Sequence, residues 1–212
     1  GAQIHRTVHL TTRLQMELGG KNPLIVMEDA DLDVAVDLAI KGGFSLTGQA
    51  CTGTSRILVV PSVKAAFTEK LLTRVAALKI GNGMKPGMDL GPLATEKQLK
   101  TVLKYVEIGK SEARLLCGGE RLTGGEFDKG YYVAPAVFTD VKNNMRIAQE
   151  EIFGPVLAII EVADFNDALA KANDTEYGLS ASIVTKLEWR SGTHRPRYDR
   201  ITSLLMKPTT SR

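Results

Sequence analysis

Cysteine and tryptophan are scarce in this sequence, whose 212 residues include only two cysteines and one tryptophan. Two cysteines are too few for the disulfide framework on which many small secreted domains depend, so the sequence predicts a cytoplasmic protein with reduced thiols. No apolar run approaches the roughly 20 residues that a membrane-spanning helix needs. The opening residues, GAQIHRTVHLTTR, lack the apolar stretch of a secretory signal. We therefore expect no membrane partner.

A large excess of charge of one sign is also missing from most of the chain. The net charge is +3. Residues 186–212 contain seven basic and two acidic residues, and subtracting their +5 leaves −2 for residues 1–185. A basic surface of the kind that binds nucleic acid is thus confined to one end, and we expect no nucleic-acid partner. Residues 186–212 show neither helical nor strand periodicity and are interpreted as an atypical tail.

Strand and helix patterns alternate through the rest of the chain. Apolar runs predict strands, and apolar residues at helical spacing after Asp, Thr or Pro-Ser starts predict helices. Alternation at these lengths implies crossover connections and a largely parallel sheet flanked by helices, which is the α/β class. The predicted strands are 14–20, 56–60, 113–119, 131–141, 156–162 and 179–185; the predicted helices are 29–44, 62–80, 95–106 and 164–175, with a Gly/Pro-rich loop at 81–94.

Cys51 lies in the segment TGQACTGTSR, among glycine and small hydroxyl residues. Such neighbours let a substrate reach the sulfur, and a turn after a helix leaves backbone N–H groups to receive an oxyanion. An inert thiol is the alternative, and the residue pattern alone favours it. A metal site is not expected, because Cys117 has no Cys-x-x-Cys partner and His5 and His9 lack an intervening glutamate in the metalloprotease pattern.

Glu17 is a carboxylate in the predicted strand 14–20, just before Gly19 and Gly20. Residues that end a strand at a glycine turn commonly line a cleft in parallel sheets. Taken alone, however, Glu17 is better explained as a surface carboxylate on the polar face of the strand.

Three motifs that occur in order resemble the aldehyde dehydrogenase superfamily: MELGGKNP at 16–23, FSLTGQACTGTSR at 44–56 and EEIFGPV at 150–156. The resemblance covers about residues 1–185. The matching positions of the nucleophile motif are Phe44, Gly48, Gln49, Cys51 and Arg56.

The resemblance implies an aldehyde-dehydrogenase-like catalytic domain that oxidises a small-molecule aldehyde, with a semialdehyde as a candidate, to the carboxylic acid with NAD or NADP. Cys51 would be the nucleophile and pass through a thiohemiacetal and a thioester. Glu17 would activate the water that hydrolyses the thioester. Glu151 and Phe153 would hold the nicotinamide ribose, and the backbone of Leu18 and Gly19 would lie near the nicotinamide. The cofactor-binding residues implied are therefore Leu18, Gly19, Gln98, Glu151 and Phe153.

The resemblance also implies a truncated domain organisation. Residues 1–18 correspond to the end of a cofactor-binding domain and residues 19–185 to most of the catalytic domain. Because the pyrophosphate-binding turn would precede residue 1, and later family motifs do not follow Thr185, we expect a fragment truncated at both ends, or a reading-frame change near Lys186. We expect this chain alone to be inactive or nearly so. Full-length family members form homo-oligomers.

Two other function classes are consistent with the residues. Cys51 could serve a thiol acyltransferase or esterase that uses no nicotinamide, in which case ester hydrolysis would depend on this cysteine. Alternatively, the chain is a non-catalytic binding or structural domain, in which case Cys51 would be unreactive toward iodoacetamide.

Overall fold

The computed structural model describes residues 1–186, and the predicted tail beyond Lys186 lies outside the described residues. The described chain contains one six-stranded sheet in the order β3-β4-β5-β2-β1-β6. Neighbouring strands are parallel except for β3 and β4, which confirms the predicted α/β class. The strands are β1 (Asn22–Val26), β2 (Thr54–Val59), β3 (Arg114–Cys117), β4 (Ala136–Thr139), β5 (Val156–Glu161) and β6 (Ser182–Val184).

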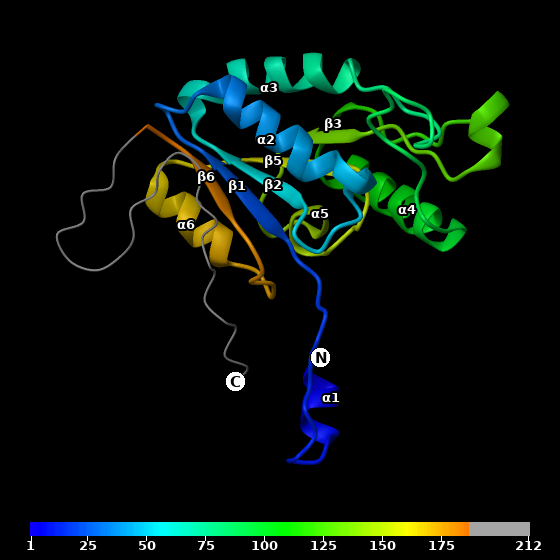
Figure 1. Cartoon of the computed structure of the whole chain (residues 1–212). Coiled ribbons are helices and arrows are strands. Elements are labelled where there is room, and N and C mark those ends of the chain that lie inside the picture. Colours follow the sequence, from blue (N-terminus) through cyan, green and yellow to red (C-terminus); the bar gives the residue numbers. More distant parts are fainter. Residues whose placement is uncertain (187–212) are drawn as a thin grey trace.

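Helices cover both faces of this sheet (Figure 1). Successive strand side chains point to opposite faces, so Leu24 packs in the cluster beneath α2 and α3, and Ile25 in the cluster with α4, α5 and α6. Burying each such side chain contributes about 1.5–3 kcal/mol. The helices are α1 (Ala2–Thr7), α2 (Leu32–Phe44), α3 (Pro61–Ala76), α4 (Glu96–Glu112), α5 (Arg146–Gln149) and α6 (Phe165–Asn173), with short 3-10 turns η1 (Ser45–Gly48) and η2 (Gly125–Lys129).

Side-chain caps fix where three of the predicted helices begin. Asp31 accepts hydrogen bonds from the backbone N–H groups of Asp33 and Val34, and Thr95 and Asp164 each accept one at the start of α4 and α6. Each cap contributes about 1 kcal/mol. The predicted starts at Thr95 and Asp164 are confirmed, whereas α2 begins three residues after the predicted start at Asp29, because Asp31 supplies the cap.

The strand prediction at 14–20 is wrong. Leu14, Met16 and Leu18 are 37%, 40% and 56% exposed, and residues 13–21 form an extended segment that none of the described strands pairs with. A period-two pattern does not make a strand without a neighbour for its backbone hydrogen bonds. In Figure 1 this segment and α1 project away from the sheet.

The strand β1, for which no prediction was made, lies between β2 and β6. All five of its residues are buried. A strand with helices on both faces has a continuous apolar sequence without alternation. In β1 this run is short and begins with Asn-Pro, which is typical of a turn, so the pattern did not indicate a strand. Cys117, in the predicted strand 113–119, is half-buried because β3 is an edge strand.

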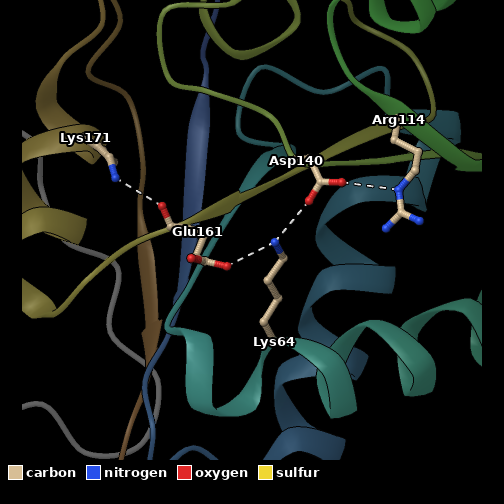
Figure 2. A network of polar contacts seen from close by, with 5 residues as sticks. All are labelled: Lys64, Arg114, Asp140, Glu161 and Lys171. Atoms are coloured by element: carbon tan, nitrogen blue, oxygen red, sulfur yellow. Dashed lines mark hydrogen bonds and ion pairs between the residues drawn. The ribbon is translucent and has the colours of Figure 1, made fainter.

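A network of charged side chains joins the carboxyl ends of β4 and β5 to the start of α3 (Figure 2). The Lys64 ammonium lies 3.3 Å from an Asp140 oxygen and 3.1 Å from a Glu161 oxygen, and Arg114 Nε lies 3.2 Å from the other Asp140 oxygen. Lys171 donates to the Glu161 carbonyl. All of these residues except Arg114 line a cavity of about 310 Å³. Their charges are already paired, that of Lys171 with Asp167, so the network ties elements together.

No helix among residues 1–186 is long and apolar enough to cross a membrane.

Candidate active site

The residues of the three sequence motifs meet at the amino ends of the parallel strands. Asn22 at the start of β1 is in register with Thr54 of β2, and Arg56 with Ala158 of β5. The segments that precede β1, β2 and β5 therefore end at the same edge of the sheet. Open parallel sheets usually bind ligands at the carboxyl ends of their strands. The motifs meet at the amino ends instead, so the expectation that Glu17 lines a cleft because it ends a strand does not describe this site.

Cys51 lies in a tight turn just before β2. The Gly53 N–H donates to the Ala50 carbonyl at 2.9 Å, which closes a four-residue turn with Cys51 at its second position. The thiol side chain is half-buried and not in a disulfide. The Cys51 N–H has no hydrogen-bond partner among residues 1–186, so its donor is unused within the described chain.

Asn22 and Gly20 hold this turn from the side of β1. The Asn22 side-chain amide donates to the carbonyls of Cys51 and Gly53, at 2.8 and 2.9 Å. Gly20 packs so closely that a Cβ on it would lie 2.2 Å from the Cys51 carbonyl oxygen. Only glycine fits there, which explains the second glycine of the Glu-Leu-Gly-Gly-Lys motif.

Glu151 lies against the same glycine pair. Its Oε1 accepts a hydrogen bond of 2.8 Å from the Gly20 N–H, and a Cβ on Gly19 would meet its Oε2. A carboxylate has further lone pairs for other donors. Phe153, two residues on, is 38% exposed and has a φ of 57°. The sequence-predicted residues Gly19, Cys51, Glu151 and Phe153 are thus brought to one edge of the sheet.

Gln98 holds the Glu151–Phe153 segment from α4. Its side-chain amide donates to the carbonyls of Ile152 and Phe153, at 2.8 and 2.9 Å. Two donations to adjacent carbonyls stabilise the left-handed backbone of Phe153, which is uncommon for a residue other than glycine.

Glu150, next to Glu151, is held by two side chains. Arg146 donates to both of its carboxylate oxygens, at 2.6 and 2.8 Å, and Tyr105 donates to one of them. The hydrogen bonds from Arg146 and Tyr105 lower the pKa of Glu150 to about 2. The clamp therefore stays ionised at neutral pH and fixes the backbone that leads into Glu151.

The turn before Cys51 is held by polar side chains as well. Gln49 accepts from the Ala94 N–H at 2.9 Å, and Thr47 donates to the Gly91 carbonyl at 3.1 Å. Gly48 has a φ of 70° and packs against Gly154, where a Cβ would lie 2.2 Å from the Gly154 carbonyl oxygen. The motif residues Gly48 and Gln49 therefore join the Cys51 turn to two neighbouring loops.

Glu17 and Leu18 are exposed on the extended segment, and no hydrogen bond or ion pair joins either of them to Cys51 among the described residues. Glu17 precedes Gly20 by three residues, a span of at most about 11 Å of extended chain. The path of the backbone thus keeps Glu17 within reach of the Cys51 edge but does not fix its carboxylate there.

Three polar residues at this edge were not among the predicted functional residues, because their burial depends on the tertiary structure. Asn22, Lys21 and Arg56 are 3%, 1% and 0% exposed. A buried polar group needs hydrogen-bond partners, and these become visible only in the folded structure. In the sequence, the one sign that these three residues matter is that they lie within the motifs.

Lys21 gives a pH dependence of stability. Its burial, together with repulsion from Arg56, lowers the pKa of its ammonium group to about 7, against attraction from Glu151 and Glu150. Between pH 7 and the ordinary value of 10.5 the unfolded chain binds more protons at this residue than the folded chain, so stability rises with pH in that window. Urea unfolding between about pH 7 and pH 9 should show a gain of about 1–3 kcal/mol relative to Lys21→Met.

The Lys21→Met protein is the control for the wild-type protein. Subtracting its free energy of unfolding at each pH removes the contribution of Cys117, whose pKa is raised by burial. Parallel pH curves for the two proteins would contradict the prediction.

Comparisons with known proteins identify relatives of this chain. The chain matches the model of the Aldehyde dehydrogenase family over residues 1–193, beyond the residue 185 at which we placed the end of the resemblance. The alpha-ketoglutaric semialdehyde dehydrogenase of Bacillus subtilis (strain 168) is 50% identical over 175 residues, which are 82% of this chain and 36% of that protein.

Solved structures show the same similarity. Betaine aldehyde dehydrogenase from Staphylococcus aureus in complex with NAD+ is 38% identical with a TM-score of 0.78, over 80% of this chain and 34% of that chain. A 1-pyrroline-5-carboxylate dehydrogenase from Thermus with bound NAD is 43% identical with a TM-score of 0.76, over 80% of this chain and 32% of that one. The chain therefore belongs to the aldehyde dehydrogenase family, and it spans about a third of the length of these relatives.

Proposed function

We propose that this chain carries the nucleophile half of an aldehyde oxidation that uses NAD or NADP and yields the carboxylic acid. The observation that carries the proposal is the Cys51 turn: a half-buried thiol whose own N–H has no partner among the described residues, beside Gly20, which is hydrogen-bonded to Glu151. Cys51 and Glu17 are the proposed nucleophile and base.

In the proposed reaction the Cys51 thiolate attacks the aldehyde carbon, a C–S bond forms, and the carbonyl electrons become an oxyanion to which the Cys51 N–H donates. NAD(P)+, when bound, supplies the acceptor for the hydride that leaves this carbon. Cys51 then carries a thioester. Glu17 takes a proton from water, the resulting hydroxide attacks the thioester carbon, and the C–S bond breaks to release the acid and the thiolate.

The residues present fit the nicotinamide end of such a cofactor. Glu151 offers carboxylate lone pairs for ribose hydroxyls, and the exposed Phe153 ring offers an apolar face. Leu18, Gly19 and Gln98 complete the proposed cofactor set, with Gln98 acting through the backbone of Phe153. The neighbouring cavity between Gly20, Gly48 and Glu151 is only about 20 Å³, so the cofactor would lie on the outside of this edge.

We also propose the domain division 1–18 and 19–185. The exposed apolar side chains of Leu14, Met16 and Leu18 support it, because an alternating apolar face is suited to pack in a further sheet. The 50% identical relative supports a semialdehyde as the substrate. Two cysteines without a disulfide support a cytoplasmic location, and the family supports homo-oligomers for longer chains.

The test is alkylation of the purified chain by iodoacetamide, with Cys51 and Cys117 quantified separately by mass spectrometry. Succinic semialdehyde or propanal should slow alkylation of Cys51 but not of Cys117, and NAD+ should add protection that is reduced in Glu151→Gln. Steady formation of NADH should be absent or very slow. The chain spans about a third of the length of its relatives, and positioning of the reactants supplies several kcal/mol of the rate enhancement.

Other outcomes separate the remaining function classes. Acylation of Cys51 by esters, with no protection by either aldehyde or by NAD+, would favour a thiol acyltransferase or esterase. A Cys51 that reacts with neither iodoacetamide nor an ester would favour a non-catalytic domain. Oxidation of propanal with NAD+ at an ordinary enzyme rate would overturn the expectation that this chain alone is nearly inactive.

A further inference from the structure

We propose that Asn22 is a positioning residue for the nucleophile: its side-chain amide fixes the turn of residues 50–53 so that the Cys51 N–H and thiol face the same reacting carbonyl. This inference deepens the proposed function, on which its catalytic meaning rests.

Both the nitrogen and the oxygen of the Asn22 side-chain amide are hydrogen-bonded, and the residue is buried in a strand. It starts β1 and is only 3% exposed. Its Nδ2 donates to the carbonyls of Cys51 and Gly53, and its Oδ1 accepts from the Ser180 N–H at 3.0 Å. One side chain therefore joins the start of a central strand, the nucleophile turn and the segment before β6.

The hydrogen bonds fix both peptide planes beside the Cys51 Cα. The plane before it is held because the Ala50 carbonyl accepts from the Gly53 N–H, and the plane after it is held because the Cys51 carbonyl accepts from Asn22. In a trans peptide the C=O and N–H point in opposite directions. The Cys51 N–H therefore points away from the Ala50–Gly53 bond, and its direction is set together with that of the side chain.

Among residues 1–186, Asn22 supplies the only hydrogen bond to the Cys51 carbonyl. Gly20 contacts the same Cys51 carbonyl from the neighbouring chain segment, and Ser180 reaches Thr52 only through a 3.4 Å hydroxyl bond. Without the Asn22 side-chain donors, the Cys51 carbonyl oxygen loses its partner and the Gly53 carbonyl oxygen loses one donor. The peptide plane after the Cys51 Cα would then no longer be fixed, and only the Ala50–Gly53 hydrogen bond would constrain the direction of the Cys51 N–H.

The experiment compares two reactions of Cys51 in the 212-residue chain. p-Nitrophenyl acetate acylates a thiolate through a tetrahedral oxyanion, with p-nitrophenolate leaving, and so it depends on the Cys51 N–H. Iodoacetamide alkylates by direct displacement of iodide and forms no oxyanion. In Asn22→Asp, which keeps the acceptor for Ser180 but replaces both donors by a carboxylate oxygen, the acylation rate constant should fall roughly 10- to 100-fold. The alkylation rate constant should change by less than about threefold.

Asn143→Asp is the matched control. Asn143 is also buried, at 8% exposure, and its amide donates to Asp174 while its oxygen accepts from Arg56. This variant should leave the ratio of acylation to alkylation unchanged. Cys117 reports on general loosening, since faster alkylation there means that the fold has opened.

A second measurement keeps the inference testable on its own. Hydrogen exchange of the Gly53 amide should become at least about tenfold faster in Asn22→Asp. Unchanged exchange at Gly53, or equal losses of acylation and alkylation, would overturn the positioning role. A wild-type chain that shows no acylation would overturn Cys51 as the proposed nucleophile, and the Gly53 exchange would then decide the positioning of the turn.

Discussion

Replacing Cys51 by alanine should abolish acylation of the chain by p-nitrophenyl acetate, a loss of roughly 1000-fold or more relative to the wild-type protein. The reason is that the half-buried thiol is the proposed attacking group, and no hydrogen bond joins the hydroxyl of nearby Thr52 or Ser55 to a general base among the described residues. A hydroxyl without such a base is a weak nucleophile at neutral pH. The measurement is the initial burst of p-nitrophenolate, with far-ultraviolet circular dichroism to show that the variant is folded.

Cys117→Ala is the control for this experiment. Cys117 is the other thiol of the sequence, and burial raises its pKa, so less of it is thiolate at neutral pH. The control should keep the burst within about twofold of wild type. A burst that survives in Cys51→Ala, or disappears in Cys117→Ala, would contradict the assignment of the nucleophile.

Replacing Arg56 by methionine should lower the free energy of unfolding by about 3–5 kcal/mol, which is a large share of the stability of a single domain. Arg56 is fully buried. Its guanidinium donates to the carbonyls of Lys21, Lys171 and Ala172 at 2.9 Å each, and to Asn143 Oδ1 at 3.2 Å. Methionine would leave these acceptors buried without a donor.

The ionisation state of Arg56 does not weaken this expectation. Burial lowers the pKa of its guanidinium to about 10 against attraction from Asp174, so the group is still protonated at neutral pH. Arg56→Lys should recover only part of the loss, because a single ammonium cannot reproduce the planar fork of donors. Urea unfolding at neutral pH measures all of these changes.

The matched control is Arg74→Met, which removes an arginine from the surface. Arg74 pairs with Asp37 at 2.6 Å, and both side chains are about half exposed. Such an ion pair contributes at most about 1 kcal/mol. A loss of stability for Arg56→Met that is no larger than for Arg74→Met would show that the buried guanidinium does not hold these segments together.

Much of the fold was predictable because its signals are local. Asp31, Thr95 and Asp164 cap helices through groups two or three residues away, and apolar spacing shows which helix face is buried. The strand at 14–20 failed for the opposite reason, since a strand depends on a neighbour that no local pattern supplies. β1 was missed because burial on both faces removes the alternation that marks a strand.

The sequence by itself determined which side chains have the right chemistry: a cysteine among small residues, two motif carboxylates and an aromatic ring, in the order of one family. Only the tertiary structure decided which segments meet. Arg56 joins residues 35 to 116 positions away along the chain, and Asn22 joins segments 29 to 158 positions away. Such contacts follow from strand order and register, which are set by packing of the whole sheet.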